Sequence, residues 1–306
     1  MSRSRKNNGR KINGILILDK PIGLTSNAAL QRVKRLFGAA KAGHTGSLDP
    51  LASGVLPICF GEATKFSQFL LDADKGYQVT IKLGVRTDSS DAEGEIVSIK
   101  PAGHITEQQI RQELKTFEGE IDQVPSMFSA IKHNGQPLYK LARQGIVVER
   151  TARRIRIDHI DLVSFQGRNV KLDIACSKGT YIRTIADDLG EQLGCGAHVI
   201  ELRRSKAGPY DLEDSITLEQ LEQLISEGGH QALDARLLPL GSSVVDFPEL
   251  RLPEASAYYL RQGQAIQVAN TPAEGWVQIH HQDGEFIGVG EILDDGKVAP
   301  RRLVSS

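Results

Sequence analysis

The sequence predicts an α+β fold, with one large sheet domain followed by a small β module. Strands and helices mix along the chain without a strict β-α-β repeat, which argues against a doubly wound sheet. The composition is that of a globular protein, since 40% of the 306 residues are hydrophobic and 25% are charged. The chain is therefore long enough to bury a sizeable core.

The N-terminal part is predicted to fold as a strand, a turn and a helix. The stretch GILILD is typical of a buried strand. Thr25 or Ser26 can cap the helix that follows, whose apolar residues recur at helical spacing until Gly38 ends it. Further on, GYQVTIKLG alternates apolar and polar residues, so it predicts a half-buried strand with Tyr77 on the inward face.

The rest of the chain repeats both patterns. Thr106 and Gln109 form a capping box ahead of one helix, and Thr217 and Gln220 form a second box ahead of another. NVKLDIAC alternates like a strand, and after SKGT the apolar spacing changes to that of a helix. From about residue 250 the pattern changes to short strand-like pieces, QAIQVAN, GWVQIHH and EFIGVGEIL, separated by Gly, Pro and Asp.

We therefore expect three parts: a basic, flexible arm (1–12), the sheet domain (13–250) and the β module (251–306). The sequence shows no signal peptide and no apolar run of membrane-spanning length, which favours a cytoplasmic protein. Cys59, Cys176 and Cys195 lack paired metal-ligand spacing. We interpret them as core thiols and expect no metal site.

Charge is segregated along the chain, although the net charge is only −1. Residues 211–227 form an acidic run without a base, whereas the segment 124–156 holds many bases and the single acid Glu149. Such clusters fit either a polyanion, RNA or DNA, bound on one face or a set of solvated loops and helix faces. The candidate phosphate contacts are Lys132, Lys140, Arg143, Arg150, Arg153, Arg154, Arg203 and Arg204.

A single carboxylate, Asp49, lies in the stretch GHTGSLDPLASG, between glycines and a proline. Two interpretations stay open from these residues alone. Asp49 can cap a helix that starts at Pro50, or it can be a rigidly held reactive group. A phosphate-binding loop is a weaker match, because neither GxGxxG nor GxxxxGK[ST] occurs in this stretch.

Tyr181 and Arg183 lie where a strand ends and a helix begins, a junction that often presents side chains to a cleft. An arginine in the first helical turn opposes the helix dipole, so we expect a carboxylate such as Asp49 to pair with it. The alternative is a surface arginine in water. The loop TDSSDAEGE fails the EF-hand pattern, so we interpret it as a solvated hairpin loop with Asp91 as a candidate second partner of Arg183.

Six stretches together carry a resemblance to a known family. They are LDKPIGLTS, AGHTGSLDPLASGVLPICFGEATK, KGYQVTIKLGVRTDSSDAEGE, VPSMFSAIKHNGQPLYKLARQG, CSKGTYIRTIADDLG and HVIELRRSKAGPY. In this order, and over nearly the whole chain, they resemble the TruB family of bacterial tRNA pseudouridine synthases. The family's usual GHTGALDPLATG differs here at Ser47 and Ser53, which are small-for-small changes.

The resemblance implies a pseudouridine-synthase fold, with a central mixed, largely antiparallel sheet flanked by helices and a small all-β PUA-like C-terminal domain. It implies an enzyme that isomerises the uridine at position 55, in the T-loop of tRNA, without a cofactor or metal. Asp49 matches the catalytic aspartate, Arg183 the arginine paired with it, and Tyr77 the residue that stacks on the flipped base and is a candidate base catalyst. The further substrate-binding candidates are His44, which enters the T-loop, Lys20, which supports the pocket loop, Tyr181, Leu202 and Asp91.

These residue types suit the chemistry that the resemblance implies. A uridine in a folded loop must be flipped into a closed pocket before its glycosidic bond can break. His44 can stack in the gap that the base leaves, and Tyr77 can stack on the extruded base. A carboxylate nucleophile then acts at the base, at the ribose or through a glycal, three routes that the sequence leaves open. A phenol can take the proton that C5 of uracil must lose.

The basic segment 124–156 matches the family's clamp insertion over the T-arm, so we expect binding that weakens with salt. We expect a monomer without an obligatory protein partner and without membrane contact. Two other functions remain open. One is a guide-RNA-dependent synthase of the dyskerin type, which would be inactive on bare tRNA transcript. The other is a non-catalytic tRNA-binding or folding protein, for which Asp49→Asn would change nothing.

Overall fold

The computed structural model describes residues 9–305, which form two compact units. Unit 1 comprises Met1–Leu48, Val55–Asp72 and Gly208–Ser306, and unit 2 comprises Asp49–Gly54 and Ala73–Ala207. Residues 1–8 of the predicted flexible arm lie outside the described residues. The last part of that arm is held in place, because the Arg10 guanidinium pairs with the Asp234 carboxylate of unit 1.

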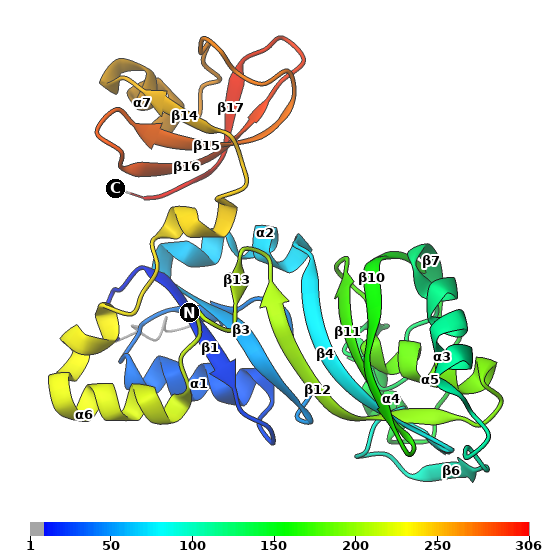
Figure 1. Ribbon diagram of the computed structural model, residues 1–306. Helices are drawn as coiled ribbons and strands as arrows, with labels where there is room; N and C mark the ends of the chain where they lie inside the picture. The colour runs from blue at the N-terminus through cyan, green and yellow to red at the C-terminus, as the bar shows by residue number, and fades with distance from the viewer. Residues whose placement is uncertain (1–8, 306) are drawn as a thin grey trace. The chain divides into compact units, whose positions relative to one another are not determined.

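Unit 2 is built on an antiparallel sheet (Figure 1). Its strands lie in the order β12 (Ala197–Ala207), β4 (Lys75–Leu83), β11 (Asn169–Cys176), β10 (Arg153–Gln166) and β7 (Gly119–Gln123). The start of β3 (Ala52–Phe60) runs parallel to β12, since Ala52 pairs with Leu202 and Gly54 with Arg204. The sheet is therefore mixed and largely antiparallel, as expected.

The alternation in the sequence decides which face of this sheet is buried. Along β4, Val79, Ile81 and Leu83 are buried on the inward side, while Gln78 and Lys82 are exposed on the other. Helix α5 (Ile182–Gln192) packs on β12, and its Ile185, Ala186 and Leu189 are buried. Helix α3 (Glu107–Leu114) begins at the predicted capping box and continues into the 3-10 turn η2 (Lys115–Phe117).

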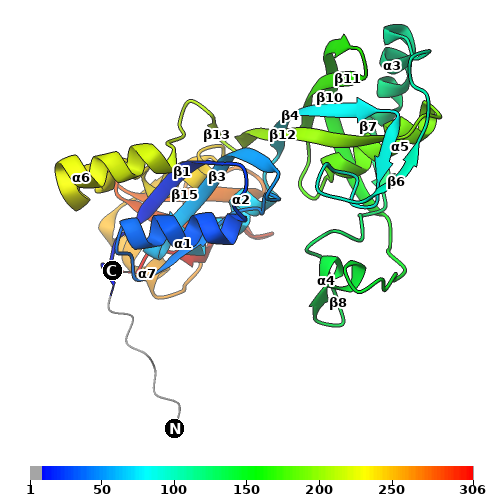
Figure 2. The same cartoon turned by 90° about the horizontal axis from the view of Figure 1, so that it is seen from below.

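Two smaller pieces complete unit 2. Strands β5 (Val85–Thr87) and β6 (Ile96–Ile99) form a hairpin. The predicted clamp segment, residues 124–156, contains the two-residue strands β8 (Lys132–His133) and β9 (Gln136–Pro137) and the helix α4 (Leu138–Ala142), which project from the rest of unit 2 (Figure 2). Met127, Leu138 and Leu141 give this segment a small hydrophobic core of its own.

Unit 1 holds β1 (Gly14–Lys20), β2 (Ala42–His44) and the remainder of β3. Thr25 caps α1 (Ser26–Leu36) through a 3.1 Å bond that its Oγ1 accepts from the Ala28 N–H, and Gly38 ends the helix with a φ of 58°. The unit also contains α2 and α6, the short strand β13 and the turns η1 and η3 (Ser67–Asp72, Leu218–Asp234, Tyr210–Asp211, Gly61–Lys65 and Leu240–Val244). Helices α1 and α6 share one core with β1 and β3.

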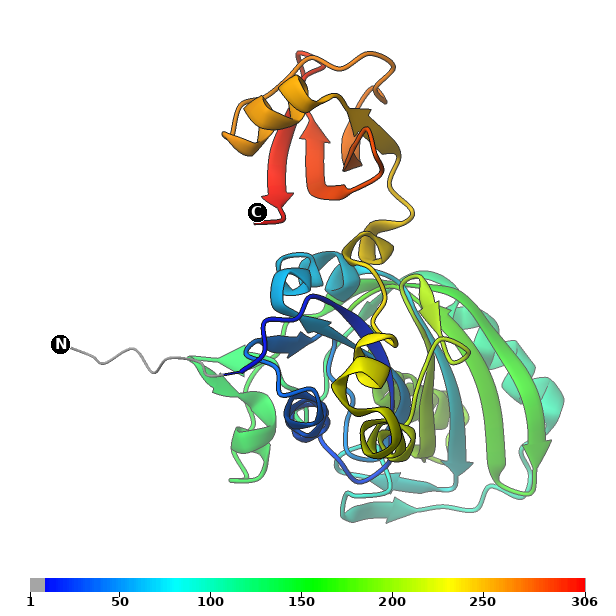
Figure 3. The same cartoon turned by 90° about the vertical axis from the view of Figure 1, so that its left-hand side faces the viewer.

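The C-terminal residues form a four-stranded sheet in the order β14 (Glu249–Leu252), β15 (Gly275–His281), β16 (Phe286–Ile292) and β17 (Val298–Leu303) (Figure 3). Two details differ from the expected all-β module. Helix α7 (Glu254–Arg261) accompanies the sheet, because Ala257 and Leu260 recur at helical spacing and are buried. QAIQVAN is not a strand, since it contributes only an isolated bridge between Ile266 and Val298.

The three cysteines are buried and free. Burial raises the pKa of the Cys59 thiol to about 12 and that of Cys176 to about 11. The interpretation as core thiols is thus confirmed. No helix among residues 9–305 is both long and apolar enough to cross a membrane.

Candidate active site

Asp49 lies in a turn that leads directly into β3. Its carbonyl accepts a 3.0 Å hydrogen bond from the Ala52 N–H, and the chain is extended from Ala52 onward. The interpretation of Asp49 as a helix cap is therefore wrong, since no helix starts at Pro50. Gly54 has a φ of 103°, and a Cβ there would lie 2.2 Å from the Arg204 carbonyl oxygen. This glycine lets the Asp49 turn approach β12, which no larger residue would allow.

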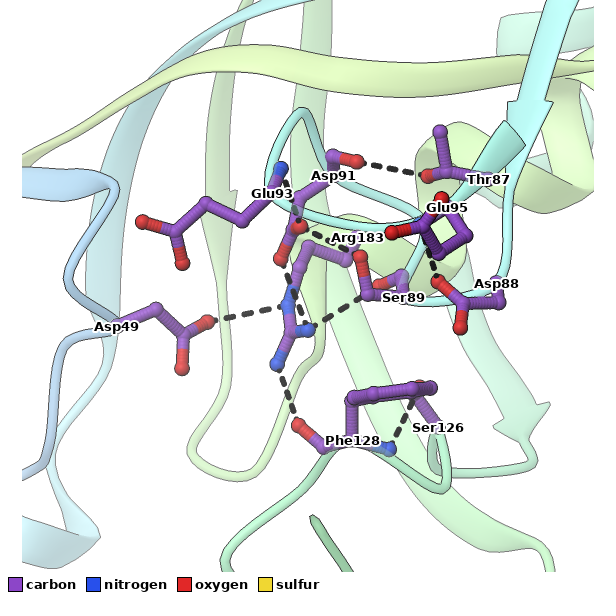
Figure 4. A network of polar contacts seen from close by, with 10 residues as sticks. All are labelled: Asp49, Thr87, Asp88, Ser89, Asp91, Glu93, Glu95, Ser126, Phe128 and Arg183. Atoms are coloured by element: carbon purple, nitrogen blue, oxygen red, sulfur yellow. Dashed lines mark hydrogen bonds and ion pairs between the residues drawn. The ribbon is translucent and has the colours of Figure 1, made fainter. Parts of the chain in front are cut away.

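Arg183 and Asp49 form the predicted ion pair. The Nε of Arg183 lies 3.0 Å from Oδ2 of Asp49 (Figure 4). The two side chains differ in exposure, because that of Arg183 is 6% exposed and that of Asp49 is 44% exposed. The pair thus presents an accessible carboxylate whose orientation is fixed from behind by a buried cation.

Asp91 is the second partner of Arg183. Its Oδ2 lies 3.1 Å from Nη1 of Arg183, and the Asp91 side chain is only 5% exposed. Its Oδ1 accepts hydrogen bonds from the Ser89 hydroxyl at 2.6 Å and from the Glu93 N–H at 3.1 Å. The candidate pairing is confirmed, but the solvated loop was wrong for Thr87 and residues 89–91, which are buried. A buried guanidinium needs a nearby anion, and folding this loop inward supplies it.

The remaining donors of Arg183 are also used. Nη1 donates to the Ser89 carbonyl at 3.1 Å, and Nη2 donates to the Phe128 carbonyl at 2.8 Å. Phe128 belongs to the clamp segment, so the base of that segment contacts the same guanidinium as Asp49 (Figure 4). Three directions of the planar group are fixed, which leaves it little freedom to rotate.

Tyr77 lies on the inward face of β4, as predicted, opposite Ile174 of β11 and Arg204 of β12. Burial raises the pKa of its phenol. The positive charge and a hydrogen bond of Arg204 oppose that rise, whereas the negative charge of Asp49 adds to it. Tyr77 therefore shares the electrostatic surroundings of Asp49 and is neutral at physiological pH.

Tyr181 and Leu202 line up with the same elements of unit 2. Tyr181 is the N-cap residue of α5, and burial raises the pKa of its phenol. Its backbone is held by Gln123 at the end of β7, which accepts from the Tyr181 N–H at 2.8 Å and donates to its carbonyl at 3.1 Å. Leu202 is buried between Ala52 and Val79. The sequence gave no signal for Gln123, because its role depends on a partner far along the chain.

His44 and Lys20 belong to unit 1. His44 pairs with Ile58 at the end of β2 and is half-buried. Lys20 is completely buried, and its ammonium donates to the carbonyls of Pro21 at 2.8 Å and Leu24 at 2.6 Å. As a substrate contact Lys20 was therefore wrong, whereas its expected support of the loop is confirmed.

The candidate phosphate contacts separate by exposure. Arg204 is 1% exposed, so it is not a surface contact, and this prediction was wrong. Arg150 is half-buried and donates to the Pro125 carbonyl, and Arg203 donates to the Ser53 hydroxyl. Arg143 is half-buried and stacks on the Tyr139 ring. The fully exposed candidates are Lys132, Lys140, Arg153 and Arg154.

The fold resembles solved structures over nearly the whole chain. One is "Structure of H/ACA RNP bound to a substrate RNA containing 2'-deoxyuridine", with a TM-score of 0.74, 27% identity and coverage of 96% of this chain and 85% of that one. Another is "Crystal Structure of a Cbf5-Nop10-Gar1 Complex", with a TM-score of 0.73, 28% identity and coverage of 96% and 84%. Both relationships extend through the two units.

Family models and curated relatives agree. The N-terminal domain of the TruB family pseudouridylate synthases matches residues 34–182, and two C-terminal models of the same family match residues 183–245 and 248–304. Fold and site thus define a pseudouridine synthase. A relative from Tolumonas auensis is 57% identical over 99% of this chain and 96% of its own, and one from Stutzerimonas stutzeri is 56% identical over 97% of each. Both are named tRNA pseudouridine synthase B, and the present chain belongs to the TruB family.

Proposed function

We propose that this enzyme converts one uridine of tRNA, at position 55 in the T-loop, into pseudouridine, with Asp49 as the nucleophile. The observation that carries this proposal is the Asp49 carboxylate, accessible on one side and paired with buried Arg183 on the other. The two relatives named as tRNA pseudouridine synthases support the choice of tRNA. The position within tRNA rests on the sequence motifs alone.

The reaction starts with a flipped uridine beside Asp49. The N1–C1′ bond breaks and its electron pair stays with N1, while Asp49 either adds to C1′ or takes the proton from C2′ to leave a glycal. Arg183 keeps the carboxylate aimed in both cases, so little reorganisation is needed when the bond breaks. Asp91 balances the buried charge of Arg183 and leaves the Asp49 carboxylate available for reaction.

The free base then rotates and C5 bonds to C1′. C5 must lose its proton and N1 must gain one, so the product is an isomer of the substrate and no external reactant is consumed. The phenol oxygen of Tyr77, once ionised, is the proposed acceptor of the C5 proton. The electron pair of the C5–H bond returns to the ring and restores the uracil π system. Tyr77 afterwards releases the proton to solvent.

Exposed cations of the clamp segment are the proposed phosphate contacts: Lys132, Lys140, Arg153 and Arg154. Such contacts give affinity without sequence information and weaken with salt. We propose that the enzyme acts alone, as a monomer in the cytoplasm. The guide-RNA assembly named for one solved relative concerns a chain 27% identical to this one, whereas the tRNA enzymes reach 57%.

The test is tritium release from bare tRNA transcript that carries [5-³H]uridine, because loss of the C5 proton is the signature of the isomerisation. We expect one tritium per tRNA, and none from a transcript with cytidine at position 55. Release that continues from the cytidine transcript would overturn the assigned position. Release that requires an added guide RNA would favour the dyskerin-type alternative. Failure of both transcripts, with intact binding, would favour a non-catalytic tRNA-binding protein.

A further inference from the structure

Arg204 is the largest side chain that is fully buried among residues 9–305. A guanidinium is costly to remove from water unless charged or polar groups receive it. Its backbone is fixed on both sides, by Tyr77 of β4 and by Gly54 of β3. The fold therefore holds this cation at a defined place, and the reaction proposed above has so far given it no task.

The sheet register directs Arg204 toward the phenol of Tyr77. Arg204 and Tyr77 stand directly opposite each other, as do Leu202 and Val79 one step along the same face. Directly opposite residues have Cβ atoms about 4.5–5.5 Å apart, within reach of two long side chains. The Arg204 side chain hydrogen-bonds the phenol. The neighbouring Arg203 lies on the other face, where it donates to Ser53.

The electrostatic effect of this pair follows from its geometry. Burial makes an anionic phenol unfavourable and raises the pKa of Tyr77, and the nearby Asp49 carboxylate raises it further. Arg204 is the cation that works in the opposite direction, through both its charge and its hydrogen bond. Without Arg204 the phenolate would have no cation to offset these two effects.

We propose that Arg204 is a positioning residue for Tyr77, which holds the phenol oxygen toward the rotated base and balances the charge on that oxygen when it is ionised. The proposal rests on the proposed function, in which the phenolate removes the C5 proton. The proton moves from C5 to the phenol oxygen, and the hydrogen bond from the guanidinium then weakens because its acceptor has become neutral. Arg204 itself keeps its protons throughout and does not touch the base.

The test compares Arg204→Met, which keeps the length of the side chain without its charge, with Arg204→Lys, which keeps the charge without the planar fork. Incorporation of 3-fluorotyrosine lets ¹⁹F NMR follow the titration of Tyr77, with Tyr77→Phe identifying the signal. We expect the titration to move to higher pH in Arg204→Met and to return partly in Arg204→Lys. Lys82→Gln, on the opposite face of β4, removes one positive charge as a control and should leave the titration in place.

The kinetic arm uses single-turnover tritium release with saturating enzyme. We expect Arg204→Met to be at least ten-fold slower, with the rise of the rate displaced to higher pH. Because Arg204 acts through the phenol, the double variant Tyr77→Phe/Arg204→Met should be as slow as Tyr77→Phe alone, within about two-fold. Effects that multiply would mean that Arg204 acts without Tyr77 and would overturn the proposal, as would an unmoved ¹⁹F titration. Absence of tritium release from the wild type would refute the proposed function instead, whereas the titration still tests the pair.

Discussion

Arg183 shows how a single residue can organise a reactive site. Its guanidinium meets Asp49 on one edge, Asp91 on another and two backbone carbonyls, while the helix dipole of α5 works against it. The two carboxylates together carry more charge than the one cation neutralises. The surplus resides on Asp49, which is the more exposed of the two.

We expect Asp49→Asn to abolish tritium release, because the amide is neither a nucleophile nor a partner of Arg183. Affinity for tRNA should stay within a few-fold, since phosphate contacts dominate binding. Filter binding and single-turnover release on the same preparation measure both. Normal turnover in this variant would remove Asp49 from the mechanism.

We expect Arg183→Lys to lower the rate of the chemical step by two or more orders of magnitude. Lysine keeps the charge but cannot contact Asp49, Asp91 and the Phe128 carbonyl in one plane. Single-turnover release at saturating enzyme isolates that step from binding. A defect that disappears at saturating enzyme would instead make Arg183 a phosphate contact.

We expect Asp91→Asn to destabilise the fold by up to about 3 kcal/mol, because it leaves buried Arg183 with a single carboxylate partner. Thermal unfolding followed by circular dichroism measures this effect. Glu93→Gln is the matched control in the same loop, since Glu93 is exposed and takes part through its backbone N–H. Equal melting temperatures for the two variants would contradict a structural role of the Asp91 charge.

At the scale of elements, periodic segments were predictable and close approaches were not. The strand of Tyr77, the caps at Thr25, Thr106 and Thr217 and the helix after SKGT follow from local patterns that the structure confirms. The buried state of Asp91 and Arg204 depends on partners about ninety to over a hundred residues away in the chain. No local pattern encodes such distances, so these residues were assigned to solvent.

The junction of β3 with β12 yields a prediction about an element. Gly54→Ala should cost about 1–3 kcal/mol, because a φ of 103° is strained for alanine and the new methyl group would meet the Arg204 carbonyl. The Asp49 turn must then shift, so single-turnover release should slow as well. Gly103→Ala is the control, since nothing lies within 4 Å of a Cβ at that position. Equal stability of the two variants would show that this approach is unimportant.

At the scale of the whole molecule, segregated charge matters more than the net charge of −1. We expect log Kd for tRNA to rise linearly with log salt, because counterions are released from the RNA. Lys132→Gln/Lys140→Gln should lower the slope by roughly 1–2, as each exposed lysine gives up one phosphate contact. Glu118→Gln, an exposed change that removes negative charge outside the clamp segment, should not lower the slope. An unchanged slope in the lysine variant would place the RNA elsewhere.

The hydrogen bond from Arg183 to the Phe128 carbonyl makes the base of the clamp segment and the reacting carboxylate thermodynamically linked. Whatever displaces that carbonyl changes the hold on Asp49, and by reciprocity a change at Asp49 is felt at the clamp. RNA engaged by the clamp would therefore supply both affinity and a signal of its arrival. A minimal RNA that reaches the pocket but leaves the clamp unoccupied would be bound yet turned over slowly, and such an RNA would be discriminated at the chemical step.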